Sequence, residues 1–452
     1  MGRITLQQAA QWVGGQIDPK YKDVTFCGAE YDSRNLKPGE LFVAIKAARD
    51  GHDFIPAALS KGAAAVLCSR CDGDYPAIVV EDTRLALGKL AEMELKRLGV
   101  KVVAVTGSVG KSTTKEMIVS VLETAYRVAK TPANRNNDLG MPAAILSMPE
   151  EAQIAVLEMG MSHFGEIEYL SRIGCPDLAV IINIGTMHIE NLGSQEGILQ
   201  AKLEILAGLK AGGKLLLNGD DALLRTVREK GQLQPFYFGT ASDCQVRAEN
   251  VLETAEGIHY DVVSGNDRFG AYLALEGQHY VIDSLAAVAV GKALNISDEN
   301  IQKGLAAFHT MAGRQEIFAV NGRTIISDCY NAGPESMAAA LAVLGNRPGR
   351  HIAVLGDMLE LGDHAPKAHE AVGAIAAQKA HVILAYGPDG EYVQKGATEA
   401  GMAEENALWF TDRDALAQYL KQISQPEDVL LFKGSRGMRM ELILEKFLQQ
   451  EN

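Results

Sequence analysis

The hydrophobic pattern of this chain alternates, over most of its length, between short apolar runs and amphipathic stretches with helical spacing. Up to residue 81 the apolar runs are brief, at 41–45, 64–67 and 78–80, and turns rich in Gly, Asp and Pro separate them. From Thr83 a helical pattern leads into a long alternation of strand-like and helical segments, which is typical of βα units and a mostly parallel sheet. The strands predicted there lie at 100–106, 154–159, 178–184, 214–217 and 235–238.

The second half of the chain repeats this alternation after an interruption. Short polar alternation covers 244–275, and an Ala- and Val-rich helix is predicted at 280–294. Beyond Gly313 the pattern predicts strands near 323–328, 351–355, 381–386, 407–410 and 428–432, separated by helices at 336–344, 366–379, 413–423 and 439–448. We therefore predict an α/β protein of three domains. Residues 1–81 form an N-terminal α/β domain, 82–312 a central, mostly parallel α/β domain, and 313–452 a C-terminal Rossmann-like domain.

Composition narrows the class of protein. The 452 residues carry a formal net charge of −14, which disfavours nonspecific binding to nucleic acid or to anionic membranes. The N-terminus is too polar for a signal peptide, and no apolar run approaches a transmembrane span. The six cysteines include one CxxC pair, Cys68 and Cys71, and without a second pair we read them as free thiols. We expect a cytoplasmic, monomeric protein that acts on small molecules, with no nucleic-acid partner and no membrane insertion.

The segment 102–114 carries the strongest chemical signal. An apolar β-branched run ends in a turn bracketed by Gly107 and Gly110, and Lys111 and Ser112 then open a helix with one apolar face. Glycines allow backbone N–H groups to close on phosphate oxygens, and a helix N-terminus adds partial positive charge. The loop is shorter than the GxxxxGK[ST] spacing, because position 105 is Val. The alternative is an ordinary Gly-rich βα turn, but Lys, Ser and the flanking elements together favour nucleoside triphosphate binding.

Three further residues of the central domain are candidates for chemistry. Glu158 ends a predicted strand, at the sheet edge where ligands of open α/β sheets bind, although it could simply cap a helix or lie in solvent. His188 follows the next strand, where a lone histidine is often only polar surface. Lys202 lies on the apolar face of a predicted helix, so it points inward; it is either a site lysine, lowered in pKa or modified, or a stem that extends its ammonium to the helix edge.

The predicted C-terminal domain gathers polar residues at several strand ends. Arg314 follows Gly313, Asp328 ends a strand, and Tyr330 and Asn331 begin the next turn. The segments 355–362 and 433–436 end two further strands. Each group alone could be turn chemistry, but their joint position predicts a cleft between two α/β domains.

Taken together, these residues resemble the ATP-dependent Mur ligases of peptidoglycan precursor synthesis, over nearly the whole chain. The supporting strings are Asp32-Ser33-Arg34, Asp50-Gly-His-Asp-Phe54, Thr106-Gly-Ser-Val-Gly-Lys-Ser-Thr113, Asn136-Asn137-Asp-Leu-Gly-Met-Pro142, Glu158-Met-Gly-Met-Ser-His163, Asn183-Ile-Gly-Thr-Met-His188, Ala201-Lys202-Leu-Glu204, Tyr330-Asn331, Ser336-Met-Ala-Ala-Ala-Leu341, Gly356-Asp-Met-Leu-Glu-Leu-Gly362 and Lys433-Gly-Ser-Arg436. The last four are particular to the family branch that uses D-alanyl-D-alanine. The resemblance implies an amide ligase that adds D-alanyl-D-alanine to UDP-N-acetylmuramoyl-tripeptide through an acyl phosphate.

The resemblance also implies a role for each matching position. ATP would contact Thr106, Gly107, Ser108, Gly110, Lys111, Ser112, Thr113, Asp283, Arg314 and Asp328. Ser112 and Glu158 would hold one Mg²⁺, and His188 and Lys202 a second, with Lys202 carboxylated to a carbamate; Lys111, His188 and Lys202 are the implied catalytic set. Ser33 and Arg34 would bind the UDP group in the N-terminal domain, and Asn137, Tyr330 and Asn331 would contact the rest of the substrates.

Some positions depart from the family pattern, and other functions stay open. Tyr280 and Asp283 stand where family members usually carry Asn, which affects the expected adenine contacts. A sibling ligase that adds a single amino acid is one alternative, although no Asp-Asn-Pro-Arg loop occurs in the chain. A folylpolyglutamate-synthase-like enzyme would lack the N-terminal UDP domain. A P-loop NTPase without ligase chemistry would leave Lys202 and the C-terminal polar cluster unexplained.

Overall fold

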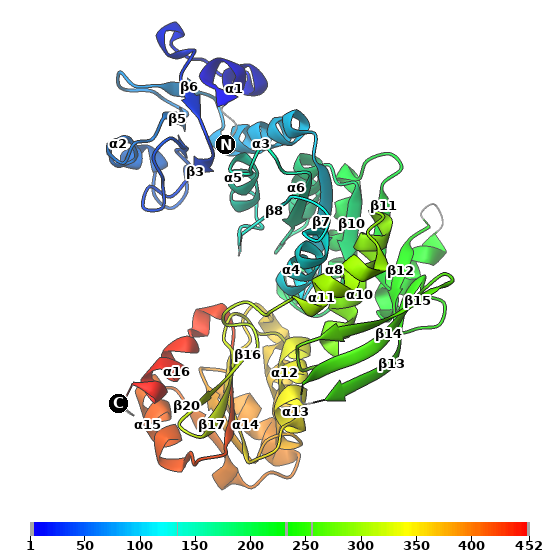
Figure 1. The fold of residues 1–452 in the computed structure, drawn as a ribbon. Helices are drawn as coiled ribbons and strands as arrows, with labels where there is room; N and C mark the ends of the chain where they lie inside the picture. Colours follow the sequence, from blue (N-terminus) through cyan, green and yellow to red (C-terminus); the bar gives the residue numbers. More distant parts are fainter. Residues whose placement is uncertain (1–3, 133, 231–233, 255, 450–452) are drawn as a thin grey trace.

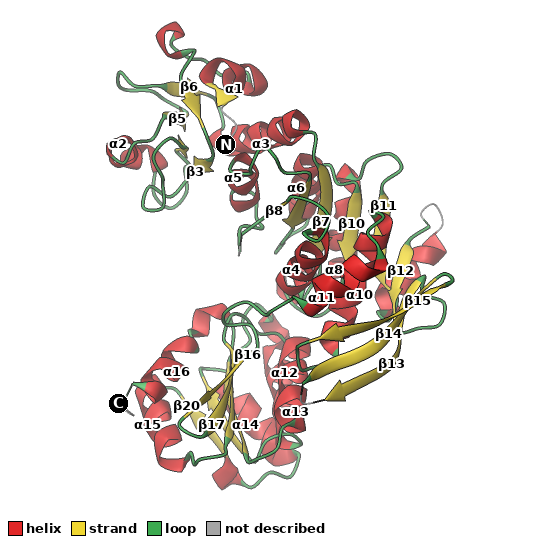
Figure 2. Ribbon diagram, in the orientation of Figure 1, coloured by secondary structure: helices red, strands yellow, loops and turns green. Residues whose placement is uncertain are grey.

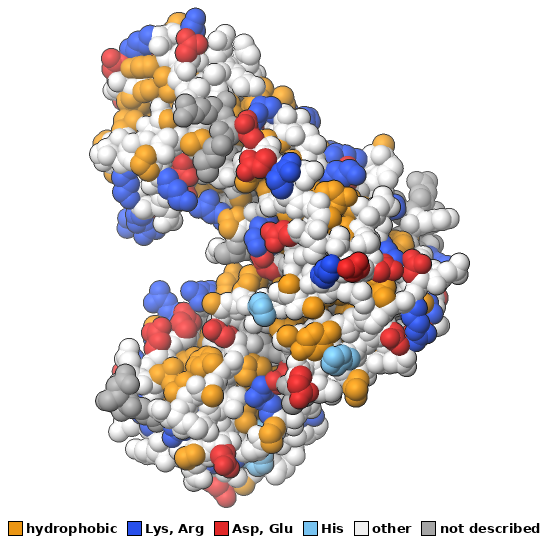
Figure 3. Space-filling view, in the orientation of Figure 1, with side chains coloured by type: hydrophobic (Ala, Val, Ile, Leu, Met, Phe, Trp, Pro, Cys, Tyr) orange, Lys and Arg blue, Asp and Glu red, His pale blue; other side chains and the backbone are white. Residues whose placement is uncertain are grey.

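The computed structural model describes residues 4–132, 134–230, 234–254 and 256–449. They form three α/β bodies in chain order, arranged as a crescent in which the central body joins the other two (Figure 1). The predicted α/β class with three domains is confirmed. The space-filling view shows a wide hollow on the concave side, between the N-terminal and the C-terminal body (Figure 3).

The N-terminal body is built on a four-stranded parallel sheet in the order β3-β4-β5-β6, beside a small antiparallel pair of β1 and β2. Its elements are β1 (Ile4–Thr5), α1 (Leu6–Val13), β2 (Thr25–Phe26), β3 (Ala29–Glu30), β4 (Leu41–Val43), α2 (Ile55–Ser60), β5 (Ala65–Cys68) and β6 (Ala77–Val79), with 3-10 turns at Pro19–Tyr21 and Gly51–Phe54. All three apolar runs predicted in this region are strands of the parallel sheet. Strands β4 and β5 are buried on both faces, as parallel strands usually are, whereas Val79 at the end of β6 is partly exposed.

The central body contains a nine-stranded sheet in the order β15-β14-β13-β12-β11-β10-β7-β9-β8. Its elements are α3 (Thr83–Leu98), β7 (Lys101–Thr106), α4 (Lys111–Leu122), β8 (Val128–Lys130), α5 (Gly140–Leu146), β9 (Ile154–Glu158), α6 (Glu166–Gly174), β10 (Leu178–Ile181), α7 (Ile189–Leu192), α8 (Gln195–Leu203), β11 (Lys214–Asn218), α9 (Ala222–Arg225), β12 (Phe236–Gly239), β13 (Val246–Thr254), β14 (Gly257–Ser264), β15 (Asp267–Leu273), α10 (His279–Ala293) and α11 (Asp298–Ala306), with 3-10 turns at Glu204–Gly208 and Thr226–Lys230. The strands from β8 to β13 are parallel, and β13, β14 and β15 form an antiparallel meander. The polar alternation at 244–275 is this meander, with one face in solvent.

Helix α3 ties the first two bodies together. The Asp82 carboxylate accepts hydrogen bonds from the N–H groups of Arg84 and Leu85, which begins the helix, and Gly99 in the left-handed region ends it. Buried Leu87 and Leu90 belong to the same apolar cluster as residues of α1 and of the central strands. The hydrophobic core is therefore continuous from the N-terminal body into the central one.

The C-terminal body is a six-stranded sheet in the order β16-β17-β21-β18-β19-β20, parallel except for β16. Its elements are β16 (Glu316–Val320), β17 (Arg323–Asp328), α12 (Pro334–Asn346), β18 (His351–Gly356), α13 (Ala365–Ala377), β19 (Val382–Tyr386), α14 (Gly390–Glu399), β20 (Ala407–Phe410), α15 (Arg413–Ile423), β21 (Val429–Lys433) and α16 (Glu441–Leu448), with 3-10 turns at Gly362–His364, Glu404–Asn406 and Arg436–Met438. Helices α12, α13 and α14 cover one face, and α15 and α16 cover the other (Figure 2). The sheet is doubly wound as predicted; β16 and α14 were not predicted.

Two other expectations are checked by the described residues. All six cysteines are free, three of them buried, which agrees with the prediction of free thiols. Across the part of the chain that the structure describes, every helix is too short or too polar to span a lipid bilayer.

Candidate active site

The parallel register of the central sheet brings the candidate residues of that body to one edge. Strand β7 lies between β9 and β10, and its end pairs Val105 with Glu158 on one side and Thr106 with Ile181 on the other. The loops that follow all three strands therefore open on the same side. This is the edge where ligands of open α/β sheets bind.

The phosphate loop is held in shape by a side chain from the neighbouring strand end. The Asn183 Oδ1 atom accepts hydrogen bonds from the N–H groups of Ser108 and Val109, both at 2.9 Å, and its Nδ2 atom donates to the Val109 carbonyl at 2.9 Å. Gly110 has a φ of 83° immediately before α4, a conformation that favours glycine. The loop is thus pre-formed at the helix N-terminus, where anions are stabilised.

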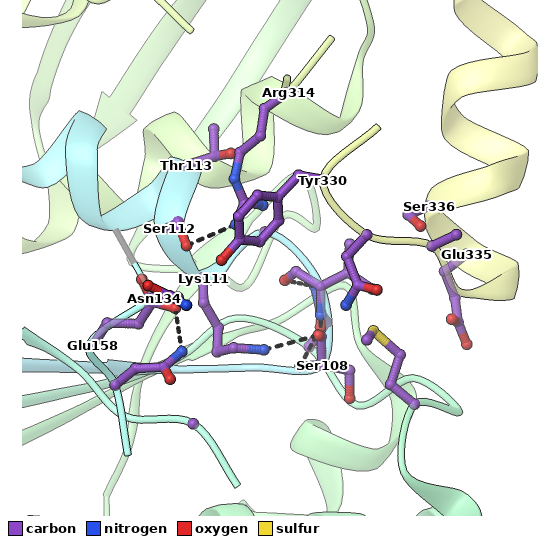
Figure 4. A pocket seen from close by; sticks show the side chains of 18 of the residues that line it. Ser108, Lys111, Ser112, Thr113, Asn134, Glu158, Arg314, Tyr330, Glu335 and Ser336 are labelled. Atoms are coloured by element: carbon purple, nitrogen blue, oxygen red, sulfur yellow. Dashed lines mark hydrogen bonds between the residues drawn. The ribbon is translucent and has the colours of Figure 1, made fainter. Parts of the chain in front are cut away.

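Lys111 points back over this loop. Its Nζ atom donates to the carbonyls of Gly107 at 2.8 Å and Ser108 at 3.0 Å (Figure 4). Burial lowers the pKa of Lys111, and the charge of Arg314 lowers it further, while Glu158 opposes both. The ammonium is therefore held next to the loop amides by weak neutral acceptors that an anion can replace.

Glu158 belongs to a buried polar network. Its Oε1 atom accepts a hydrogen bond from Asn136 Nδ2 at 2.9 Å, whereas its Oε2 atom has no hydrogen-bond partner and lies 3.6 Å from Lys115 Nζ. Lys115, on α4, is fully buried and donates to the Thr131 carbonyl at 2.7 Å. Glu158 is therefore neither a helix cap nor a solvated side chain. Lys115 was missed in the sequence, because a lysine one turn after Lys111 looks like an ordinary polar position on an amphipathic helix.

The C-terminal body supplies the opposite wall of the site. Arg314 Nη2 donates to Ser112 Oγ at 3.0 Å, and the guanidinium carbon lies 4.0 Å from the ring centroid of Tyr330. Tyr330 and Arg314 face Ser112 and Lys111 across the site (Figure 4). Such cation–π stacking holds the guanidinium in place while leaving its N–H groups available for a ligand.

Asp328 and Lys433 line the cavity from the ends of two adjacent strands of the C-terminal body. Strands β17 and β21 pair these two residues in register, and Lys433 Nζ lies 2.6 Å from Asp328 Oδ2. The same ammonium donates to the Asn331 carbonyl at 2.9 Å. Lys433 was noted in the sequence only as part of a strand end, and its partnership with Asp328 depends on the β17-β21 adjacency.

The loop after β10 connects the two walls. His188 Nδ1 lies 2.7 Å from the Oε2 atom of Glu360, and the imidazole lowers the pKa of that carboxyl. Glu335 Oε1 accepts hydrogen bonds from the Thr186 N–H at 2.9 Å and from its hydroxyl at 3.1 Å. His188 is thus an interdomain contact rather than free polar surface. Glu335 was not singled out in the sequence, since a glutamate in the first turn of a helix is common.

These elements enclose a cavity of about 620 Å³ between the central and C-terminal bodies. The predicted site residues that line it are Ser108, Gly110, Lys111, Ser112, Thr113, Asn137, Glu158, His188, Asp283, Arg314, Asp328, Tyr330 and Asn331. Thr106 ends β7 and Gly107 begins the loop, and neither lines the cavity; the Thr106 hydroxyl is buried without a hydrogen-bond partner. Asp283, expected near adenine, also packs against Gly110 of the phosphate loop, and its Oδ1 atom accepts a hydrogen bond from the Thr114 hydroxyl at 2.7 Å.

Lys202 does not line the cavity but lies buried behind it. It is 2 % exposed on α8, so the inward orientation is confirmed and the extended-stem alternative is wrong. No hydrogen bond or ion pair to Lys202 is found among the described residues. Burial lowers its pKa well below the usual value, and the nearby charge of Lys111 adds to that effect. The neutral amine is therefore easier to form at Lys202 than at an exposed lysine.

Ser33 and Arg34 lie in the N-terminal body, outside the cavity lining. The Arg34 side chain is 87 % exposed and is paired with Asp32 at 2.6 Å. Between this segment and the cavity, Arg135 pairs with the buried Glu30 and lies over the Tyr31 ring. The structure therefore separates the predicted site into two places, one enclosed and one on the surface.

The fold and the cavity define a class of protein, and comparisons with known proteins define the family. A phosphate loop that faces a second doubly wound body across a cavity is the arrangement of a nucleotide-binding α/β protein of several domains. Three family models match the chain: the Mur ligase family catalytic domain at 25–95, the Mur ligase middle domain at 105–291, and the Mur ligase glutamate ligase domain at 313–436. The chain belongs to the Mur ligase family.

Individual relatives agree over the full length of the chain. It is 40 % identical to a UDP-N-acetylmuramoyl-tripeptide–D-alanyl-D-alanine ligase of Bacillus subtilis, with 99 % of each chain covered. A crystal structure of MurF from Acinetobacter baumannii superposes with a TM-score of 0.92 at 32 % identity, covering 100 % of both chains. MurF ligase from Thermotoga maritima in complex with ADP superposes with a TM-score of 0.83 at 30 % identity, covering 94 % of this chain and 97 % of that one.

Proposed function

We propose that this chain is an ATP-dependent ligase that joins D-alanyl-D-alanine to UDP-N-acetylmuramoyl-tripeptide in peptidoglycan precursor synthesis. The observation that carries the proposal is the cavity in which Lys111 and Ser112 of the phosphate loop face Arg314 and Tyr330 of the C-terminal body. An NTPase without ligase chemistry needs only the phosphate loop and not the residues of the C-terminal body. Full-length similarity to ligases of this specificity and to an ADP-bound member supports the substrates.

The reaction couples phosphate transfer to amide formation. The terminal carboxylate of the tripeptide attacks the γ-phosphorus of ATP, so a C–O–P bond forms, the P–O bond to ADP breaks, and an acyl phosphate results. The free amine of D-alanyl-D-alanine then attacks the acyl carbon, gives up a proton and expels phosphate. Because both first reactants are anions, the site must supply positive charge around the transferred group.

The residues of the two walls supply that charge. Lys111 exchanges its carbonyl acceptors for phosphate oxygens, and the first N–H groups of α4, from Lys111 to Thr113, lack intrahelical acceptors and donate to the same group. Arg314, held by Tyr330, approaches from the C-terminal side, and Asp328 lies beside it for the ribose or adenine end. Closure of the two walls, already bridged by Glu335 and Thr186, keeps water from the acyl phosphate.

The donor set fits Mg²⁺ near the phosphate loop. Glu158 has a buried carboxylate oxygen without a hydrogen-bond partner, and Ser112 has a hydroxyl beside Lys111; both are hard oxygen donors. We infer that these two residues would hold one ion, which supplies charge neutralisation between the ATP phosphates. Among the described residues no three His, Cys, Asp or Glu side chains gather to form a metal site by themselves, and the remaining ligands of the ion would have to come from the nucleotide and water.

Lys202 and His188 would hold a second ion if Lys202 is carboxylated. A neutral buried amine attacks CO₂, forming an N–C bond and releasing one proton, and the resulting carbamate offers hard oxygens. The burial of Lys202, its lack of a partner and its lowered pKa support this modification. Extra mass of one CO₂ on Lys202 in native mass spectrometry is the expected observation.

The N-terminal body is proposed to bind the uridine nucleotide. Ser33 and Arg34 stand beside the Glu30–Arg135 contact that leads toward Asn137 in the cavity. The proposed division is 1–81 for UDP binding, 82–312 for ATP binding, and 313–452 for closing the site. We propose that the protein acts as a monomer, and the UDP-linked and ATP substrates suit the cytoplasm.

Phosphate release separates this function from its alternatives. Phosphate should appear only when ATP, UDP-N-acetylmuramoyl-tripeptide and D-alanyl-D-alanine are all present. Phosphate release from ATP alone at the same rate would favour an NTPase without ligase chemistry. Equal activity with a single amino acid in place of the dipeptide would favour a sibling ligase.

A further inference from the structure

Asp283 is a buried acidic side chain that packs directly on the phosphate loop. It lies on the second turn of α10 and is 5 % exposed. Its Oδ1 atom accepts the Thr114 hydroxyl at 2.7 Å, and a Cβ built on Gly110 would lie 3.0 Å from that same oxygen. The carboxyl group therefore touches the residue that precedes α4 as well as the first turn of that helix.

The surroundings of Asp283 contain little compensating charge. Arg314 from the C-terminal body is the cation that acts on it, Thr114 faces it from α4, and the Tyr280 hydroxyl lies on its own helix. Lys111, at the same helix end, is bonded to the loop carbonyls instead. Strands β11 to β13 and helix α11, which also pack on α10, present buried apolar side chains. Burial raises the pKa of Asp283 to about 7, against the opposing effects of Thr114 and Arg314.

The carboxylate and a bound nucleotide compete for one source of positive charge. The N-terminus of α4 and Arg314 stabilise an anion at the phosphate loop, and without nucleotide the Asp283 carboxylate is the anion nearest to Gly110. When phosphates occupy the loop, two groups of like charge share this helix end, which disfavours the ionised carboxyl. A neutral carboxyl keeps the Thr114 hydrogen bond and the packing on Gly110 without the repulsion.

We propose that Asp283 is a positioning residue that takes up one proton when a nucleotide phosphate enters the loop, so that nucleotide binding is linked to protonation of the loop's own support. This inference rests on one part of the proposed function, namely that the phosphate loop binds a nucleotide. By linkage, affinity falls as pH rises through the pKa of the free carboxyl, with a limit of about tenfold per pH unit. The nucleotide's own phosphate, with a second pKa of about 6, has finished titrating in that range.

Calorimetry of ADP binding tests the proposal without turnover. The binding heat is measured from pH 7 to 9 in pairs of buffers that differ in ionisation enthalpy, which gives the number of protons taken up. For the unaltered protein we expect up to about one proton near pH 7.5 and a Kd that rises about tenfold by pH 8.5. In Asp283→Asn the amide oxygen still accepts the Thr114 hydrogen bond. The number of protons taken up on ADP binding should fall by the share that Asp283 contributes, and the Kd should depend less on pH.

A second aspartate provides the matched control. Asp357, at the end of β18, is also buried with its pKa raised to about 7 by burial, but it does not line the cavity. Asp357→Asn should therefore keep the proton uptake of the unaltered protein. Equal uptake in Asp283→Asn and the unaltered protein overturns the proposal. So does an unaltered protein that binds ADP with no uptake, whether or not the variant folds. Failure to bind ADP at every pH would instead overturn the proposed function.

Discussion

The cavity between the central and C-terminal bodies and the Asp32-Ser33-Arg34 segment of the N-terminal body were both predicted as binding sites, yet they are built differently. In the cavity, polar side chains are buried and hold one another: Asn183 fixes the phosphate loop, and Asn136 and Lys115 fix Glu158. In the N-terminal segment, Arg34 is exposed and its partner is its close neighbour Asp32. Charged residues of the same types therefore interact strongly with a ligand in the cavity and weakly in the exposed N-terminal segment.

The difference teaches that burial decides how much each charge contributes. A charge in a low-dielectric, water-poor site interacts strongly with the developing charge of a reaction, whereas an exposed ion pair contributes little. Substitutions in the cavity should therefore change kcat by large factors. Substitutions in the 32–34 segment should change KM by small ones.

Lys111→Ala is the substitution with the largest expected effect. Removing a preorganised cation from the transferring phosphoryl group should lower kcat about 1,000-fold, equivalent to roughly 4 kcal/mol. Lys101→Ala is the control, since Lys101 is exposed at the opposite end of the same strand. Steady-state phosphate release measures both. A Lys111→Ala variant that keeps more than a tenth of the turnover would contradict the assignment of the phosphate loop.

Lys202→Ala should rank second. Losing the proposed carbamate should lower kcat roughly 100-fold, about 2.7 kcal/mol, because the proposed second metal ion would lose a ligand. Short carboxylic acids such as formate should restore part of the activity by filling the space. Lys210, an exposed lysine paired with Asp177, provides the control. Lys210→Ala should keep the kcat of the unaltered protein, and added formate should not change it. Absence of rescue together with an unmodified Lys202 would remove the second metal site and leave the phosphate loop untouched.

Arg34→Ala tests the other side of the comparison. Because Arg34 is exposed, its loss should raise KM for the UDP substrate by about tenfold or less and leave kcat unchanged. Lys37→Ala, an exposed lysine three residues away, is the control. A fall in kcat with unchanged KM would mean that the segment acts on the chemistry, and the contrast between the two places would disappear.

The smallest expected effect concerns the stability of the fold. Burial raises the pKa of Asp283 to about 7 from its ordinary value of 3.8, so the folded state binds an extra proton between these values. Stability of the unaltered protein is therefore lost progressively as pH rises from about 4 to about 7, and the loss is constant above that. Asp283→Asn should melt higher at pH 8 by roughly 2 °C and equally at pH 4. Thermal denaturation at both pH values, with Asp82→Asn at an exposed helix cap as a contrast, measures this difference.

The periodicity of apolar residues was enough to predict most strands of both large sheets, because parallel strands and amphipathic helices leave a local signature. Elements without such a signature escaped: β8 is three residues long, and β16 is an edge strand in which no residue is fully buried. The phosphate loop was predictable for the same reason as the strands. Gly110, Lys111 and Ser112 act through their own backbone and the helix that they begin.

What the sequence by itself determined is thus the set of local units and the chemistry attached to each: a phosphate loop, an inward lysine at position 202, and polar residues at strand ends. Only the tertiary structure decided which of them meet. Arg314 reaches Ser112, which is 202 positions away in the chain, and Lys433 pairs with Asp328 because β21 inserts next to β17. Strand order and domain closure depend on many weak long-range contacts that no local pattern records. For that reason Lys115, Asn183 and Glu335 gained their significance only when the bodies came together.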